Sequence, residues 1–239
     1  MKRITIFFIV LVINLSCIAY LNAMRVSVLP PKQVKIKYTF AVDLHGVIVN
    51  SSAKQIIKHA MRMNNKSLFI KHMFNPYVWK TIHKTVKKTK LLEEIFESLV
   101  VEHPQLHIFH KDLLAFSNAQ IVNSEMLVLL QQLKKEGHSL ILCSNIGPEI
   151  YTDFCKKFPQ VIQLFDNYFI TQKTSKGYIT KRHPDFYSNF KVFLKNNNYD
   201  YTKTIIIDDK QSNLDAAQKQ GLSGIIFKSV KKLRKKLAI

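Results

Sequence analysis

Short apolar runs alternate with amphipathic stretches over most of the chain. Residues with β-branched or aromatic side chains dominate these runs, which is typical of buried strands. The stretches between them carry apolar residues at helical spacing and end in turn residues such as Gly137 and Gly221. Strands that alternate with helices predict an α/β, Rossmann-like core, in which helices cover both faces of a parallel sheet. The apolar runs cover residues 34–44, 139–143, 167–171, 203–209 and 224–227.

Residues 51–116 interrupt this alternation. The stretch SSAKQIIKHAMRMNN opens with two serines that suit a helix cap, and its apolar positions follow helical spacing. The stretches LLEEIFESLVVEH and LHIFHKDLLAF show the same pattern. We therefore predict an all-α insert over 51–116, within a core that consists of residues 34–50 and 117–239.

The first 23 residues have the pattern of a secretory signal. Lys2 and Arg3 precede an almost wholly apolar stretch, and Ala19 and Ala23 offer small residues for cleavage. We predict export to the periplasm or the exterior through residues 1–23. An uncleaved segment that anchors the protein in the membrane is the alternative.

The chain is strongly basic, with a formal net charge of +20 over 239 residues. Its lysines are spread over the whole length and no nucleic-acid-binding motif accompanies them, so we expect a small anionic, phosphorylated substrate and no specific nucleic acid. Polyanion binding by the basic tail KKLRKK is a rival hypothesis. The three cysteines lack metal-ligand spacing, and the sequence does not fix the oligomeric state.

Polar side chains follow the ends of the predicted strands. Ligands of open parallel sheets bind at the carboxyl ends of the strands, where these side chains would meet. Carboxylates suit Mg²⁺, and a lysine with a hydroxyl group suits a phosphoryl group. A metal ion would also offset the repulsion between an attacking aspartate and a phosphate dianion. The side chains are Asp43 and His45, Ser144 and Asn145, Lys181, and Asp208 and Asp209.

Taken in order, these strand ends resemble the motifs of the haloacid dehalogenase-like (HAD) hydrolase superfamily. The first motif there is Asp-x-Asp-x-Thr or Val after an apolar strand, and DLHGV stands here from Asp43. The second is Ser144 in LILCSN, the third is Lys181 in KRHPDFY, and the fourth is the stretch IIIDDKQSNLDAAQKQG. The resemblance covers roughly residues 36–228, and residues 51–116 would correspond to the helical cap of that superfamily.

The resemblance implies a Mg²⁺-dependent hydrolase in which Asp43 is the nucleophile and forms an aspartyl-phosphate. Asp43, Asp209 and the backbone carbonyl of His45 would bind the metal. Asp208 belongs to the same metal site, and Asn213 would support it.

Three further residues are implied to act on the phosphoryl group. Ser144 would donate a hydrogen bond to it, Lys181 would neutralise charge on it and on Asp43, and Asn145 would orient these groups.

His45 departs from the pattern of the family's phosphatases, which have an aspartate here as the general acid and base. A histidine can do this work because its pKa lies near 6.5. The departure leaves three hypotheses. The first is hydrolysis of a small phosphate ester, the second is a catalytically impaired binding protein, and the third is cleavage of another bond such as C–halogen or C–P.

Overall fold

The computed structural model describes residues 36–238, apart from 89, 90 and 176. The predicted signal segment (1–23), Cys17 and residues 34–35 of the first predicted strand lie outside the described residues. Export and membrane anchoring therefore stay predictions. Within the described ranges, no helix is both long enough and apolar enough to cross a lipid bilayer.

A parallel sheet in the order β5-β4-β1-β8-β9 forms the core. β1 lies between β4 and β8, and Val42 pairs with Leu142 on one side and Ile207 on the other. This register brings the carboxyl ends of the three central strands to the same edge of the sheet. The strands are β1 (Thr39–Val42), β4 (Ser139–Ser144), β5 (Asn167–Ile170), β8 (Thr204–Asp208) and β9 (Ser223–Ile226).

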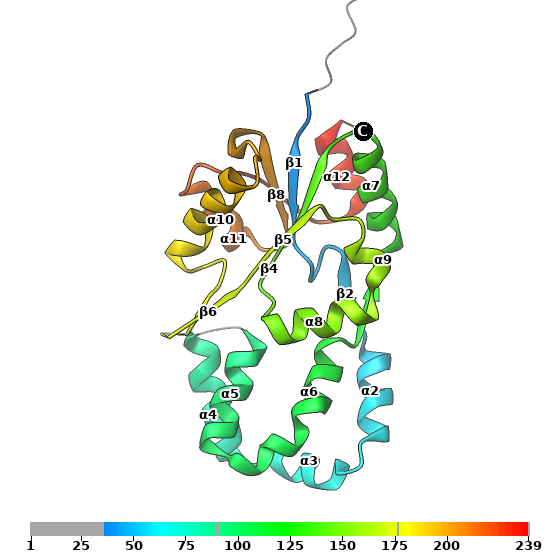
Figure 1. The fold of residues 1–239 in the computed structure, drawn as a ribbon. Coiled ribbons are helices and arrows are strands. Elements are labelled where there is room, and N and C mark those ends of the chain that lie inside the picture. The colour runs from blue at the N-terminus through cyan, green and yellow to red at the C-terminus, as the bar shows by residue number, and fades with distance from the viewer. Residues whose placement is uncertain (1–35, 89–90, 176, 239) are drawn as a thin grey trace, which may run out of the picture. The chain divides into compact units, whose positions relative to one another are not determined.

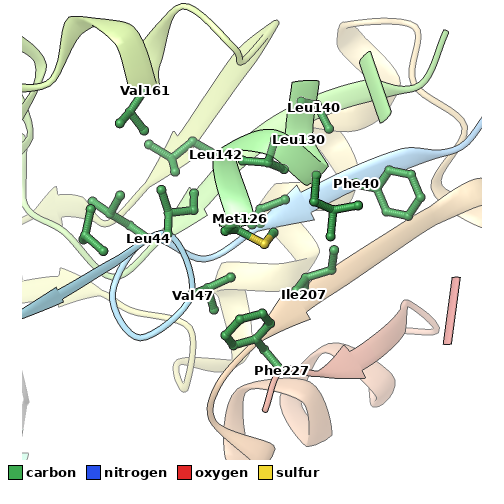
Figure 2. Packing of buried hydrophobic residues seen from close by; sticks show 14 of the residues in the cluster. Phe40, Leu44, Val47, Met126, Leu130, Leu140, Leu142, Val161, Ile207 and Phe227 are labelled. Carbon is green, nitrogen blue, oxygen red and sulfur yellow. The ribbon is translucent and has the colours of Figure 1, made fainter. Parts of the chain in front are cut away.

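Helices cover both faces of this sheet. Figure 1 shows α7 and α12 on one side and α10 and α11 on the other. On the first side, Met126 and Leu130 pack with Phe40, Leu142 and Ile207 (Figure 2). The core helices are α7 (Ser124–Lys135), α8 (Pro148–Lys157), α9 (Pro159–Ile162), α10 (Pro184–Asn196), α11 (Gln211–Gln218) and α12 (Val230–Leu237).

The second face has its own apolar layer. Phe186 and Phe190 of α10 and Leu214 of α11 are buried with Ala41 and Ile206 of the sheet. The parallel sheet and its two helical layers confirm the predicted α/β, Rossmann-like fold class.

Residues 53–117 fold into helices with a small apolar core. Met63, Val78, Leu99, Leu106 and Phe109 are its buried members. The helices are α2 (Ala53–Arg62), α3 (Lys66–Met73), α4 (Pro76–Lys88), α5 (Leu92–Glu102), the 3-10 helix η1 (Pro104–Phe109) and α6 (His110–Ser117).

The structure also contains two strand pairs that the sequence pattern did not predict. β2 (Val49–Ser51) pairs antiparallel with β3 (Gln120–Val122) where the chain enters and leaves the helical segment. β6 (Gln172–Thr174) pairs antiparallel with β7 (Gly177–Ile179). Each of these strands has three residues, too few to show an alternating pattern.

Two predicted elements differ from those observed. The first strand begins at Thr39, so its predicted extent from residue 34 was too long. The basic tail is not a loose extension, because residues 230–237 form α12 and bury Val230 and Leu233. Arg234 donates a hydrogen bond of 2.6 Å to Oε1 of Gln132, so part of the tail's charge is used within the fold.

Candidate active site

Asp43 lies immediately after the central strand and is almost completely buried. Its backbone N–H donates to the carbonyl of Ile207 over 2.8 Å, which continues the pairing with β8 by one residue. Ser144 Oγ donates to Asp43 Oδ1 over 2.9 Å, and Lys181 Nζ lies 2.9 Å from the same oxygen. Both contacts use Oδ1, so the second oxygen, Oδ2, takes part in neither.

Lys181 joins two carboxylates inside the protein. Its Nζ lies 2.7 Å from Asp208 Oδ2, and its side chain is 0% exposed. Burial lowers the pKa of the Lys181 ammonium, but the carboxylates of Asp43 and Asp208 outweigh that effect and the net shift of the pKa is upward. The backbone N–H of Lys181 donates to Oδ1 of Asn145 over 2.7 Å, so Asn145 positions the loop that carries this lysine.

Asp208 is fully engaged by the surrounding protein. Oδ1 accepts from the backbone N–H of Lys210 over 2.8 Å and from Nδ2 of Asn213 over 2.9 Å. The same Nδ2 lies 3.0 Å from Oδ2, which also accepts from Lys181. Asn213 thus holds Asp208 in place, from the first turns of α11.

Asp209 contrasts with its neighbour. Its Oδ1 is buried and has no hydrogen-bond partner among the described residues. Burial raises the pKa of Asp209, Lys210 lowers it, and the nearby Asp43 and Asp208 raise it again, with a net upward shift. A buried, unpaired carboxylate oxygen beside two other carboxylates is unfavourable unless a cation joins it.

These three aspartates fit a hard divalent cation. One oxygen from each of Asp43, Asp208 and Asp209 lies within 4.8 Å of the others. Three carboxylates face the single ammonium of Lys181, and oxygen ligands at this separation are those that Mg²⁺ takes. The orphaned Oδ1 of Asp209 is the atom that most needs such an ion.

Gly46 is required by the close approach of Asp209. Its φ is +79°, a left-handed conformation, and a Cβ at this position would lie 2.5 Å from Oδ2 of Asp209. A side chain here would therefore push Asp209 away from the other two carboxylates.

His45 lies at the tip of the same loop and is held by a residue that the sequence motifs do not identify. Its Nε2 lies 2.7 Å from Nε2 of Gln120, whose amide nitrogen also donates to the carbonyl of Ser117 over 2.6 Å. Because that carbonyl can only accept, the amide nitrogen faces it, and His45 Nε2 accepts the second amide hydrogen. The imidazole is then neutral, with its proton on Nδ1.

The surroundings of His45 agree with a neutral ring. Burial lowers the pKa of His45, the carboxylate of Asp43 raises it, and Lys210 and Lys181 lower it, so the net shift is downward. At neutral pH, its one N–H donor would be Nδ1.

A cavity of about 360 Å³ opens beside Asp43, His45 and Ser144. Four other lining residues were not predicted from the sequence: Glu93 of α5, Gln120 of β3, Arg182 and Lys210. Arg182 and Lys210 directly follow motif residues and could have been suspected for that reason. Glu93 and Gln120 come from the helical segment and its exit strand, where no motif marks them.

No protein-family model matches the sequence, and no curated protein matches it. Solved structures do match. A HAD family enzyme from Bacteroides thetaiotaomicron aligns with a TM-score of 0.54 and 21% identity over 84% of this chain and 98% of that chain. The chain has the haloacid dehalogenase-like fold.

Two other HAD structures show what this fold holds elsewhere. The same Bacteroides enzyme in complex with magnesium and inorganic phosphate aligns with a TM-score of 0.51 and 18% identity, over 81% of this chain and 95% of that chain. The L-2-haloacid dehalogenase from Xanthobacter autotrophicus, with chloropropionic acid covalently bound, aligns with a TM-score of 0.53 and 11% identity, over 85% and 83%. HAD folds thus carry more than one chemistry, and the choice among them depends on the site residues.

Proposed function

We propose that the protein is a Mg²⁺-dependent HAD hydrolase that acts on a small phosphate ester, with Asp43 as the nucleophile. The observation that carries the proposal is the buried carboxylate of Asp43, which one ammonium and one hydroxyl contact on Oδ1 while two further aspartates lie beside it. A carboxylate fixed in this way is preorganised for attack by its second oxygen, Oδ2.

The residues of the site suit two successive displacements at phosphorus. Asp43 would form the bond to phosphorus as the ester P–O bond breaks, and water would then hydrolyse the aspartyl-phosphate to regenerate Asp43 and release phosphate. Lys181 and Ser144 would stabilise charge on Asp43 and on the phosphoryl oxygens. A bound Mg²⁺ would supply positive charge to offset the repulsion between Asp43 and the phosphate.

His45 would assist the departing alcohol. With Nε2 accepting from Gln120, the Nδ1–H is the proton that the ring can donate to the leaving oxygen. In the hydrolysis step, the deprotonated Nδ1 would recover its proton from the attacking water. Gln120 would act on the reaction only by fixing the ring.

A catalytically impaired binding protein is the second candidate. The downward shift of the His45 pKa favours it, because a neutral imidazole is a weaker acid than the imidazolium ion. Such a protein would bind Mg²⁺ and phosphate and would release no product.

Phosphate release from 4-nitrophenyl phosphate and from a panel of phosphorylated metabolites tests the proposal. We expect turnover that requires Mg²⁺, is lost with a chelator, and falls at least about 10³-fold in Asp43→Asn. Asp185→Asn is the control, since this exposed aspartate lies in the first turn of α10 and does not line the cavity. Turnover that persists in Asp43→Asn would refute the assignment of the nucleophile.

A further inference from the structure

A second cavity, of about 410 Å³, lies against the first. It is enclosed by α5, η1, α6 and the start of α8, and its walls are mainly apolar, with Phe96, Val100 and Leu113 among them. Leu92, Glu93, Ser117 and Ile150 line both cavities, so the two share a wall. The apolar cavity is therefore a continuation of the space beside Asp43.

The polar side chains around the apolar cavity are largely paired with one another. His110 Nε2 lies 2.7 Å from Oε1 of Glu149, and Glu97 Oε1 accepts from Lys173 over 2.6 Å and from Tyr178 over 3.0 Å. A molecule that enters would consequently meet mostly carbon. This is the environment of an alkyl or aryl group.

Glu93 stands at the boundary between the two cavities. It is 9% exposed, and neither of its carboxylate oxygens has a hydrogen-bond partner in the described part of the chain. The carboxylate packs so closely on Gly147 that a Cβ there would overlap it. A buried acceptor without a partner is costly, and a ligand that carries a hydrogen-bond donor at this point would relieve that cost.

We propose that the substrate is an amphipathic phosphate ester whose leaving group extends past Glu93 into the apolar cavity. Its phosphate lies at Asp43, a hydroxyl close to the phosphate donates to Glu93, and an alkyl or aryl tail fills the space between α5, α6 and α8. This inference rests on the proposed function for the position of the phosphate. It adds the class of the leaving group and the residue that reads it.

Chain-length dependence tests the tail. Ethyl, butyl, hexyl and octyl phosphate, below micelle-forming concentrations, would be titrated into Asp43→Asn with Mg²⁺ and assayed as substrates of the wild type. We expect affinity and kcat/KM to rise about three- to fourfold per methylene until the cavity is full.

Val100→Trp and Leu113→Phe would fill the apolar cavity from two different helices. Each should abolish the gain with chain length and leave ethyl phosphate unaffected. Ile57→Trp is the matched control, because this residue of α2 is exposed and lines neither cavity. A gain that persists in both filled variants would overturn the inference, as would affinities and rates that do not change from ethyl to octyl phosphate.

The hydroxyl is tested with 2-hydroxyoctyl phosphate against octyl phosphate. Wild type should prefer the hydroxylated compound, Glu93→Met should lose this preference, and Glu93→Gln should restore it because its amide oxygen accepts. An unchanged preference in Glu93→Met would overturn the role of Glu93.

Failure of this inference can be told apart from failure of the proposed function. Affinity that rises with chain length without any phosphate release would support the amphipathic ligand and refute the hydrolase. Mg²⁺-dependent phosphate release at a rate independent of chain length would support the hydrolase and refute the amphipathic ligand.

Discussion

The core and the helical segment of this protein both contain lysine–carboxylate pairs, but they use them differently. Lys181 lies 2.7 Å from Asp208, and both side chains are 0% exposed. Lys84 of α4 lies 3.4 Å from Glu102 of α5, and these side chains are 66% and 44% exposed. The first pair is enclosed with further hydrogen-bond partners, whereas the second is open to water and screened by salt.

The same contrast extends to the apolar surfaces of the two regions. In the core, Phe40 and Ile207 are buried within large clusters on the sheet. In the helical segment, Phe74 is 82% exposed, Tyr77 72% and Val101 80%. The sheet edge thus fixes the charged groups, while the helices above it present adaptable surface. We infer that chemistry is assigned to the core and choice of substrate to the helices.

Removing the core lysine should have the largest effect. Lys181→Met leaves Asp43 and Asp208 buried without their cation, so we expect a loss of about 3–5 kcal/mol in the free energy of unfolding and the loss of turnover. Lys84→Met should leave both within experimental error, since its partner is solvated. Urea denaturation and phosphate release measure the two quantities. Equal losses in the two variants would break the contrast.

Glycine substitutions sharpen the contrast at the metal site. Gly46→Ala should cost about 1–2 kcal/mol for its left-handed backbone and should also weaken Mg²⁺ binding, because the new Cβ displaces Asp209. Gly221→Ala is the matched control, since its φ is +74° and a Cβ there meets no atom within 4 Å. It should show the loss of stability alone. Calorimetric titration with Mg²⁺ would contradict this account if both variants bound the ion equally.

His45 decides between the two candidate functions. If the histidine works as the acid, His45→Asp should change kcat by no more than about tenfold, because one proton donor replaces another. A rise of about 10²-fold or more would instead support the catalytically impaired protein. The pH profile of kcat in wild type and variant provides the check.

The smallest expected effect concerns Glu93 and the dependence of stability on pH. Burial raises the pKa of Glu93, while its own backbone and those of Ile150 and Gly147 lower it. Its contribution is most favourable below the ordinary pKa of 4.5 and is lost as the pH rises through the raised value. At neutral pH, Glu93→Gln should therefore raise Tm by roughly 2–4 °C, or about 1 kcal/mol.

Calorimetry at pH 4 and pH 7 would measure the difference between Glu93→Gln and wild type. Glu125→Gln, at an exposed position of α7, controls for the loss of a charge. A stabilisation of Glu93→Gln that is larger at pH 4 than at pH 7 would have the wrong sign.

The core was predictable because its signals are local. An apolar run that ends in Asp43, Ser144 or Asp208 identifies both the strand and its functional end, and the parallel topology then brings these ends together. Contacts with Gln120 and Glu93 were not predictable. They depend on how the helical segment folds back on the core, 75 residues away from His45 in the case of Gln120. A single sequence contains no pattern that specifies such packing.

Covalent labelling of Asp43 tests the central claim most directly. The protein would be quenched in acid during turnover of acetyl phosphate with Mg²⁺, digested, and analysed by mass spectrometry. We predict a phosphate-sized mass increase on the peptide that contains Asp43, absent in Asp43→Asn and after chelation of the metal. Phosphate release with the label on another residue, or with no label at all, would contradict it.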